Sequence, residues 1–186
     1  MSEIAKYREK EFKKARISFL KETQHDEALI VILRAHLLVE RELNLVLEKC
    51  LKYPDKMDLE RVTFSQKLNL VYALGMLKDG IYRSINKFNN IRNGCAHSLD
   101  YKIDENSVDS IISCLSKDEK NEMESDLGEF KISEQPSIKE KIRLVLAYLH
   151  ADITVERLVV HLTLRERSIE IEQSELTGIF STLISK

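Results

Sequence analysis

A cluster of polar side chains between residues 86 and 97 holds the residue types best suited to chemistry in this sequence. Four of them recur at positions i, i+4, i+7 and i+11, a spacing that places side chains on one face of an α-helix. These four are Asn86, Asn90, Asn93 and His97, and Asn89 and Arg92 lie between them in the sequence. An opposite stripe of Ile81, Ile85, Phe88 and Cys95 predicts the face that packs into the core.

These residue types suit the cleavage of a phosphodiester without a metal ion. An imidazole titrates near neutral pH, so His97 can accept or donate a proton. A guanidinium holds phosphate through paired hydrogen bonds and stabilises developing charge, which is the role that Arg92 would take. RNA supplies its own nucleophile in the 2′-hydroxyl, and Asn86, Asn89 and Asn90 are candidate RNA-binding residues. By spacing alone, the simpler interpretation is a polar helix face without a catalytic role. A histidine at the C-terminal end of a helix is favoured by the helix dipole.

The spacing of Arg92 and His97 sets a geometric condition on any shared site. Five residues separate them, which is about 140° around an ideal helix. Both can reach one site only if the helix ends or distorts near Gly94, or if a second copy of the chain supplies one of them. Glycine makes such a distortion inexpensive.

Residues Ile91–His97, with the sequence Ile-Arg-Asn-Gly-Cys-Ala-His, resemble the R-x(4–6)-H signature of HEPN domains, the higher eukaryotes and prokaryotes nucleotide-binding domains. The polar residue directly after the arginine is part of that signature, and it is Asn93 here. The resemblance covers roughly residues 26–115 and implies a helical bundle. Catalytic HEPN members are metal-independent endoribonucleases, commonly toxins or defence effectors, whose site forms where the motif helices of two subunits meet. The match implies that Arg92 binds phosphate, His97 is the acid or base and Asn93 supports them.

A second resemblance covers more of the chain and leaves another function open. Residues Phe64–Leu77, followed by the Arg92 to His97 segment and a long final helix, look like the mannitol operon repressor (MtlR-like) family, whose fold is HEPN-related. The match spans roughly residues 29–168. Members are labelled transcriptional regulators, yet no helix-turn-helix is recognisable here. The alternative is therefore a non-catalytic regulator, or an antitoxin or immunity-type protein that acts by binding another protein, such as a toxin or a regulator.

Helical periodicity along the whole chain predicts an all-α fold, an up-and-down bundle of HEPN type with a long C-terminal helix. We expect a single domain over residues 1–186, made of a basic N-terminal helix (1–22), a HEPN-like core (26–116), an acidic connection (117–136) and a long C-terminal helix with a tail (137–186). Capping boxes at Thr63–Gln66 and Ser137–Glu140 predict two helix starts, and Gly75 predicts a helix stop. Asp26 and Asp79 are expected to cap two further helices. The apolar stretch Ala28–Val39 predicts a central helix covered on several sides.

Charge is distributed unevenly along the chain. The first helix carries seven Lys or Arg and three Glu between residues 3 and 21, a net charge of +4, while residues 117–134 carry seven acids and three lysines, a net charge of -4. The basic helix is interpreted as a solvated face, with a phosphate-binding arm as the alternative. The acidic segment would suit a basic protein partner.

Composition excludes several classes of protein. Five Gly and two Pro argue against an all-β fold and against a Gly-rich nucleotide loop. A net charge of -2 argues against a broadly basic surface for nucleic acid. Three widely spaced cysteines and the lack of a compact His/Cys/Asp cluster predict a cytoplasmic protein without disulfides, metal or other cofactor. No apolar run approaches the roughly 20 residues of a membrane span, so we expect no membrane contact. The resemblance and the Arg92–His97 geometry together predict a homodimer.

Overall fold

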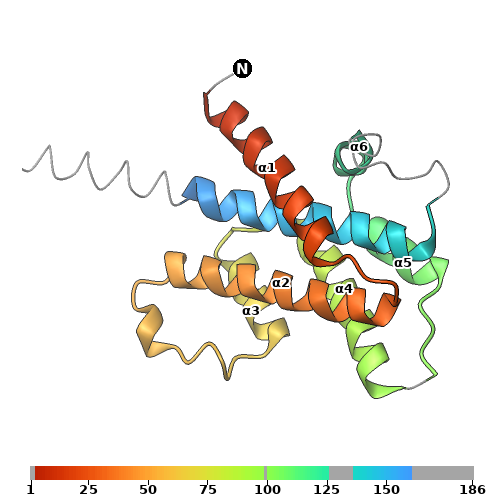
Figure 1. The fold of residues 1–186 in the computed structure, drawn as a ribbon. Helices are drawn as coiled ribbons and strands as arrows, with labels where there is room; N and C mark the ends of the chain where they lie inside the picture. The colour runs from red at the N-terminus through yellow and green to blue at the C-terminus, as the bar shows by residue number, and fades with distance from the viewer. Residues whose placement is uncertain (1–2, 99, 126–135, 161–186) are drawn as a thin grey trace, which may run out of the picture.

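The computed structural model describes residues 3–98, 100–125 and 136–160, and all regular structure within these ranges is helical. The elements are α1 (Glu3–Glu22), α2 (Ala28–Cys50), the short 3-10 helix η1 (Pro54–Lys56), α3 (Phe64–Ala73), α4 (Asp79–His97), α5 (Glu105–Ile112) and α6 (Lys117–Ser125). Residues 138–160 form a further helix, here called helix 138–160. The predicted all-α helical bundle is confirmed (Figure 1).

Helix 138–160 occupies the centre of the core. Five successive residues, Val145 to Leu149, are fully buried, which is possible only where a helix is covered on all sides. Helix α2 packs against α3 and α4, and α4 packs against α5. The central helix of the bundle is therefore helix 138–160, and not the helix that contains Ala28–Val39 as predicted. The part of the predicted C-terminal helix and tail that follows residue 160 lies outside the described residues.

Helix α2 leaves one apolar stripe uncovered, which corrects the expectation that it is enclosed. Leu29, Leu33 and Leu37, spaced at i, i+4 and i+8, expose 44%, 40% and 65% of their area. They lie on one side of the helix, while Val31, Ile32 and Ala35 on the other side are fully buried. We call Leu29, Leu33 and Leu37 the leucine stripe.

Local sequence signals explain where α3 starts and stops. The Thr63 side chain accepts from the Gln66 backbone N–H, and the Gln66 side chain accepts from the Thr63 backbone N–H, so the predicted capping box is confirmed. At the other end Gly75 has a φ of 73°, a conformation that glycine adopts at little cost. The second predicted capping box, Ser137 with Glu140, is also formed.

Two other predicted caps are displaced by one residue. The N-cap of α2 is Glu27 rather than Asp26, and its side chain makes no capping hydrogen bond. The N-cap of α4 is Lys78, so Asp79 is the first residue inside the helix. An acid in the first turn still interacts favourably with the helix dipole.

The acidic segment begins with a helix rather than a connection. Lys117–Ser125 form α6, and Met123 from this helix is 6% exposed and belongs to the core. The physical reason is a capping box at its start: the Ser116 backbone N–H donates to the Glu119 carboxylate at 2.7 Å, and the Glu119 backbone N–H donates to the Ser116 hydroxyl at 3.2 Å. Arg16 on α1 also donates a hydrogen bond to the Met123 carbonyl at 3.0 Å. The remainder of the predicted connection, up to residue 135, lies outside the described residues.

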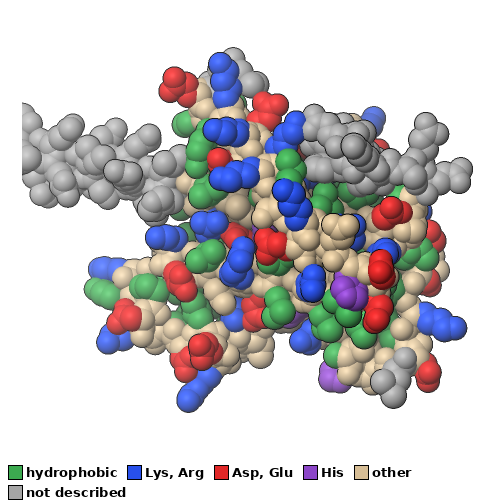
Figure 2. All heavy atoms as spheres, viewed as in Figure 1, with side chains coloured by type: hydrophobic (Ala, Val, Ile, Leu, Met, Phe, Trp, Pro, Cys, Tyr) green, Lys and Arg blue, Asp and Glu red, His purple; other side chains and the backbone are tan. Residues whose placement is uncertain are grey.

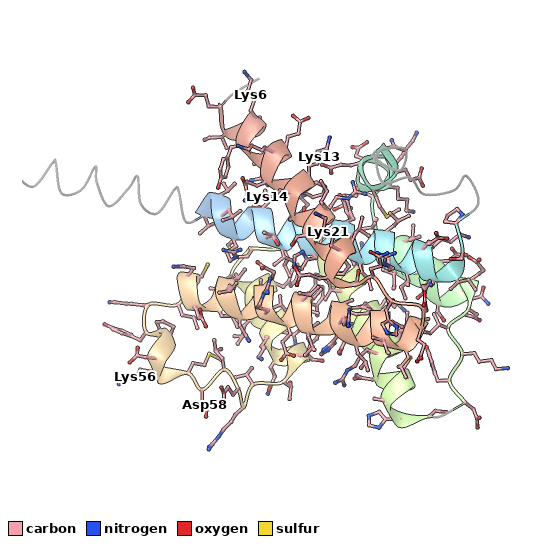
Figure 3. All side chains as sticks on the ribbon, in the orientation of Figure 1. Lys6, Lys13, Lys14, Lys21, Lys56 and Asp58 are labelled. Carbon is pink, nitrogen blue, oxygen red and sulfur yellow. The ribbon has the colours of Figure 1, made fainter. Side chains whose placement is uncertain are left out.

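The N-terminal end of α1 extends away from the bundle and presents a basic surface (Figures 1 and 2). Lys6, Lys13, Lys14 and Lys21 are exposed along its length (Figure 3). Arg16 departs from the predicted solvated face, because it is fully buried. Along the described part of the chain, no helix combines the length and the apolar character needed to cross a membrane.

Candidate functional site

Helix α4 carries the predicted polar cluster, and its apolar stripe fixes its orientation. Ile81, Ile85 and Phe88 are fully buried against the core, as their spacing predicts. The helix continues without a break to His97, and the Ser98 N–H donates to the Gly94 carbonyl at 3.1 Å. The distortion that Gly94 was expected to permit is therefore not present.

Gly94 is explained by a close packing contact instead. A Cβ at this position would lie 2.4 Å from the ring of Tyr101, the residue that packs across the last turn of α4. Any larger residue would displace this ring. The glycine therefore lets the chain after α4 fold back against the helix that carries the cluster.

Arg92 lies at a polar cleft formed by α2, the start of α3 and α4. The cleft has a volume of 270 Å³, several times the ~30 Å³ that one water molecule occupies in the liquid. Its lining consists of His36, Glu40, Val62, Thr63, Phe64, Ser65, Asn89, Arg92 and Asn93.

The polar side chains of α4 at this cleft are only partly satisfied. Arg92 donates from Nη1 to the Asn93 Oδ1 at 3.2 Å, while its buried Nε has no hydrogen-bond partner. Asn89 is 4% exposed and donates from Nδ2 to the Ser65 Oγ at 3.2 Å. The cleft thus combines a cation, amides and hydroxyls, a set that suits an anionic or strongly polar ligand.

His36 faces Arg92 across the cleft and was not anticipated as a functional residue. It is 5% exposed, its ring stacks on Phe64 with centroids 4.3 Å apart, and its Nε2 has no hydrogen-bond partner. Burial lowers the pKa of His36, the nearby Arg92 charge lowers it further, and Glu40 opposes the shift. His36 is therefore a buried histidine that also lines the cleft.

The charge of Glu40 is neutralised within the same cleft. Its Oε1 lies 2.6 Å from the Lys67 Nζ, and its Oε2 lies 3.9 Å from the His36 Nδ1. The Lys67 side chain is 3% exposed and the Glu40 side chain 26%, so the pair is half-buried, with its carboxylate at the cleft. The i, i+4 spacing of His36 and Glu40 is the one sequence signal that pointed here, but it does not reveal that α4 packs opposite.

The structure divides the predicted site residues into two groups. Arg92, Asn93 and Asn89 line the cleft. Asn86, Asn90 and His97 are exposed and are not part of its lining. The C-terminal end of α4, which carries His97, extends beyond the neighbouring helices (Figure 1).

Two further expectations concern cysteine and metal ligands. Burial raises the pKa of the Cys95 thiol, which keeps it protonated and matches its expected role as a small apolar residue packed on the core. Among the described residues, no group of three or more His, Cys, Asp or Glu side chains is arranged to hold a metal ion. Comparison with protein-family models, curated proteins and solved structures finds no match to this chain.

Proposed function

We propose that this chain is a HEPN-like, metal-independent endoribonuclease of a toxin–antitoxin or defence system, acting in the cytoplasm as a homodimer. The observation that carries the proposal is Arg92, which lies at a polar cleft with a partnerless Nε while His97 stands exposed on the same helix. This pairs a phosphate-binding cation with an accessible imidazole.

The reaction follows from these side chains and from the RNA itself. The 2′-oxygen attacks the neighbouring phosphorus, the bond from phosphorus to the 5′-oxygen breaks, and the 2′-hydroxyl proton is lost as the leaving oxygen gains one. His97 would transfer a proton, and the Arg92 guanidinium would stabilise the additional negative charge on the phosphorus oxygens. Asn93 holds Arg92 through the hydrogen bond at 3.2 Å. The products are a 2′,3′-cyclic phosphate and a 5′-hydroxyl.

The continuous α4 helix favours a site shared between two copies. Arg92 and His97 point about 140° apart on an unbroken helix, so one chain cannot aim both at a single phosphate. In a symmetric dimer, the exposed His97 of one copy can complete the cleft that holds Arg92 of the other. This arrangement uses the second of the two alternatives that the spacing left open.

The test is cleavage of single-stranded RNA by the purified full chain in the presence of EDTA. We expect cyclic phosphate ends, and we expect His97→Ala to slow cleavage by about 10²- to 10⁴-fold while the protein stays folded. His25→Ala, which removes a histidine outside the cleft, is the control and should cleave like the wild type. Cleavage retained in His97→Ala would contradict the assignment.

The leucine stripe favours a second candidate function, that of a binding protein. Three exposed leucines in one row on α2 are an uncommon feature on a monomer surface and are typical of a protein-binding face. On this hypothesis the chain is a regulator, or an antitoxin or immunity-type protein. An apolar surface of its partner would bind the leucine stripe on α2, or a basic surface would bind the acidic residues of α6.

This candidate predicts different behaviour from the ribonuclease. The chain would be harmless when expressed alone and would co-purify with its partner from cells that contain both. Leu33→Glu with Leu37→Glu should abolish that complex, and His97→Ala should leave it intact. A complex that survives the leucine changes would rule out the stripe as the binding face.

A further inference from the structure

The N-terminal end of α3 opens onto the cleft that holds Arg92. Thr63 is the N-cap, and Phe64 and Ser65 occupy the first two helical positions. Backbone N–H groups at these positions have no acceptor within the helix. They also carry the positive end of the helix dipole, which favours negative charge.

The side chains around this helix end leave an excess of positive charge. Glu40 is the one carboxylate in the lining, and it is paired with Lys67 at 2.6 Å. Arg92 remains as a cation whose Nε has no hydrogen-bond partner. Its Nη1 is engaged by the neutral amide of Asn93 rather than by an acid.

An independent observation comes from the facing wall of the cleft. His36 is 5% exposed and lines the cleft, yet its Nε2 has no hydrogen-bond partner. Buried polar atoms are normally satisfied, so the His36 Nε2 and the Arg92 Nε are two polar atoms of lining residues whose hydrogen-bonding capacity is unused. Ser65 adds a hydroxyl, which accepts from Asn89 and keeps its own proton free to donate.

We infer that this cleft is a phosphate-binding site within a single chain, built from Arg92, the first amides of α3, the Ser65 hydroxyl and His36. The inference rests on the proposed function in one respect: it locates the phosphate of the RNA backbone that the ribonuclease would hold. The Glu40 carboxylate also lines the site, and its ion pair with Lys67 keeps it from repelling the anion.

His36 provides a built-in reporter for this site. The charged groups that face it are Arg92 from α4, Glu40 from α2 and Lys67 from α3, and the Asn89 side chain also interacts with it. A phosphate beside the ring adds negative charge, which favours the protonated imidazole. Binding must therefore raise the pKa of His36, and by linkage an RNA phosphodiester, whose charge is constant in this pH range, binds more tightly as the pH falls.

The experiment is an NMR titration of the full chain with inorganic phosphate, following the imidazole signals of His36. We expect a saturable shift in the wild type and at least about tenfold weaker binding in Arg92→Gln, because a hydrogen bond to a charged group is lost. Ser65→Ala should weaken binding about two- to tenfold while leaving all charges in place. Arg83→Gln, an exposed arginine on α4 that pairs with Asp79, is the matched control and should bind like the wild type.

Two results would overturn the inference. One is a His36 signal that does not respond to phosphate in the folded wild type. The other is an Arg92→Gln or Ser65→Ala protein that is folded and binds phosphate as tightly as the control.

A second arm of the titration identifies the source of the phosphate. A 2′-O-methyl RNA oligonucleotide lacks the nucleophilic hydroxyl, so it can bind without being cleaved. We expect it to shift His36 and to compete with inorganic phosphate. Inorganic phosphate alone shifting the signal would support a site for free phosphate and would contradict the RNA source. Since the readout is binding, it stays valid whether or not the wild type cleaves RNA.

Discussion

Arg16 is among the largest fully buried side chains of the described residues, although it belongs to a helix rich in exposed lysines. Its guanidinium donates from Nη2 to the Met123 carbonyl at 3.0 Å and thereby joins α1 to α6. A buried charge held by hydrogen bonds is costly to truncate, because its acceptor is then left unsatisfied in the interior.

We therefore predict that Arg16→Ala lowers the free energy of unfolding by about 2–4 kcal/mol. Lys14→Ala, two residues away, should change it by less than about 0.5 kcal/mol, because its ammonium is exposed and its pair with Glu11 is weak. Urea denaturation of the two variants beside the wild type measures both values. Equal effects of the two substitutions would show that Arg16 has no structural role.

The start of α3 is the element that joins the fold to the candidate site. Its capping box satisfies two backbone N–H groups and places Phe64 and Ser65 at the cleft. We predict that Thr63→Ala lowers the free energy of unfolding by about 1 kcal/mol, because the side-chain acceptor for the Gln66 N–H is lost. Thr63→Ser keeps the capping oxygen and should restore most of the loss. A Thr63→Ser protein as unstable as Thr63→Ala, again by urea denaturation, would contradict this.

Elements with local signals were predictable from the sequence, and elements defined by tertiary contacts were not. The Thr63 and Ser137 capping boxes and the glycine stop at Gly75 depend on residues within one turn, so they could be identified directly. Helix α6 also starts at a local signal, the Ser116–Glu119 capping box, but its contact with Arg16, more than a hundred residues away, could not be identified in this way. The site divides in the same way: the motif around Arg92 is contiguous, whereas His36 joins it only because α2 packs against α4.

At the scale of the whole molecule, a buried histidine couples stability to pH. His150 is 5% exposed, its ring contacts Phe19 in a tilted arrangement with centroids 5.0 Å apart, and neither ring nitrogen has a hydrogen-bond partner. Burial, with the nearby charges of Arg41 and Arg157, lowers the pKa of His150 from 6.5 to about 4. The unfolded chain thus binds a proton between these pH values that the folded chain does not, so stability falls as the pH drops through this window.

We predict that His150 accounts for a loss of about 2 kcal/mol in the free energy of unfolding between pH 7 and pH 5. In His150→Leu, the difference in the free energy of unfolding between pH 7 and pH 5 should be smaller by about this amount. This holds whether the substitution stabilises or destabilises the protein at pH 7. His97→Gln, which removes an exposed histidine, serves as the control and should keep the wild-type dependence. Urea denaturation at the two pH values gives the comparison, and an unchanged dependence in His150→Leu would assign the effect to other groups.

We propose that one copy supplies Arg92 and another supplies His97 to each ribonuclease site. Arg92→Ala and His97→Ala proteins should each be inactive alone. Unfolded together in equal amounts and refolded, they form mixed dimers in which one of the two sites is intact. Half of all dimers are mixed, so we expect the mixture to cleave RNA at about a quarter of the wild-type rate. A mixture as inactive as its two parents, beside an active wild type, would contradict a site shared between two copies.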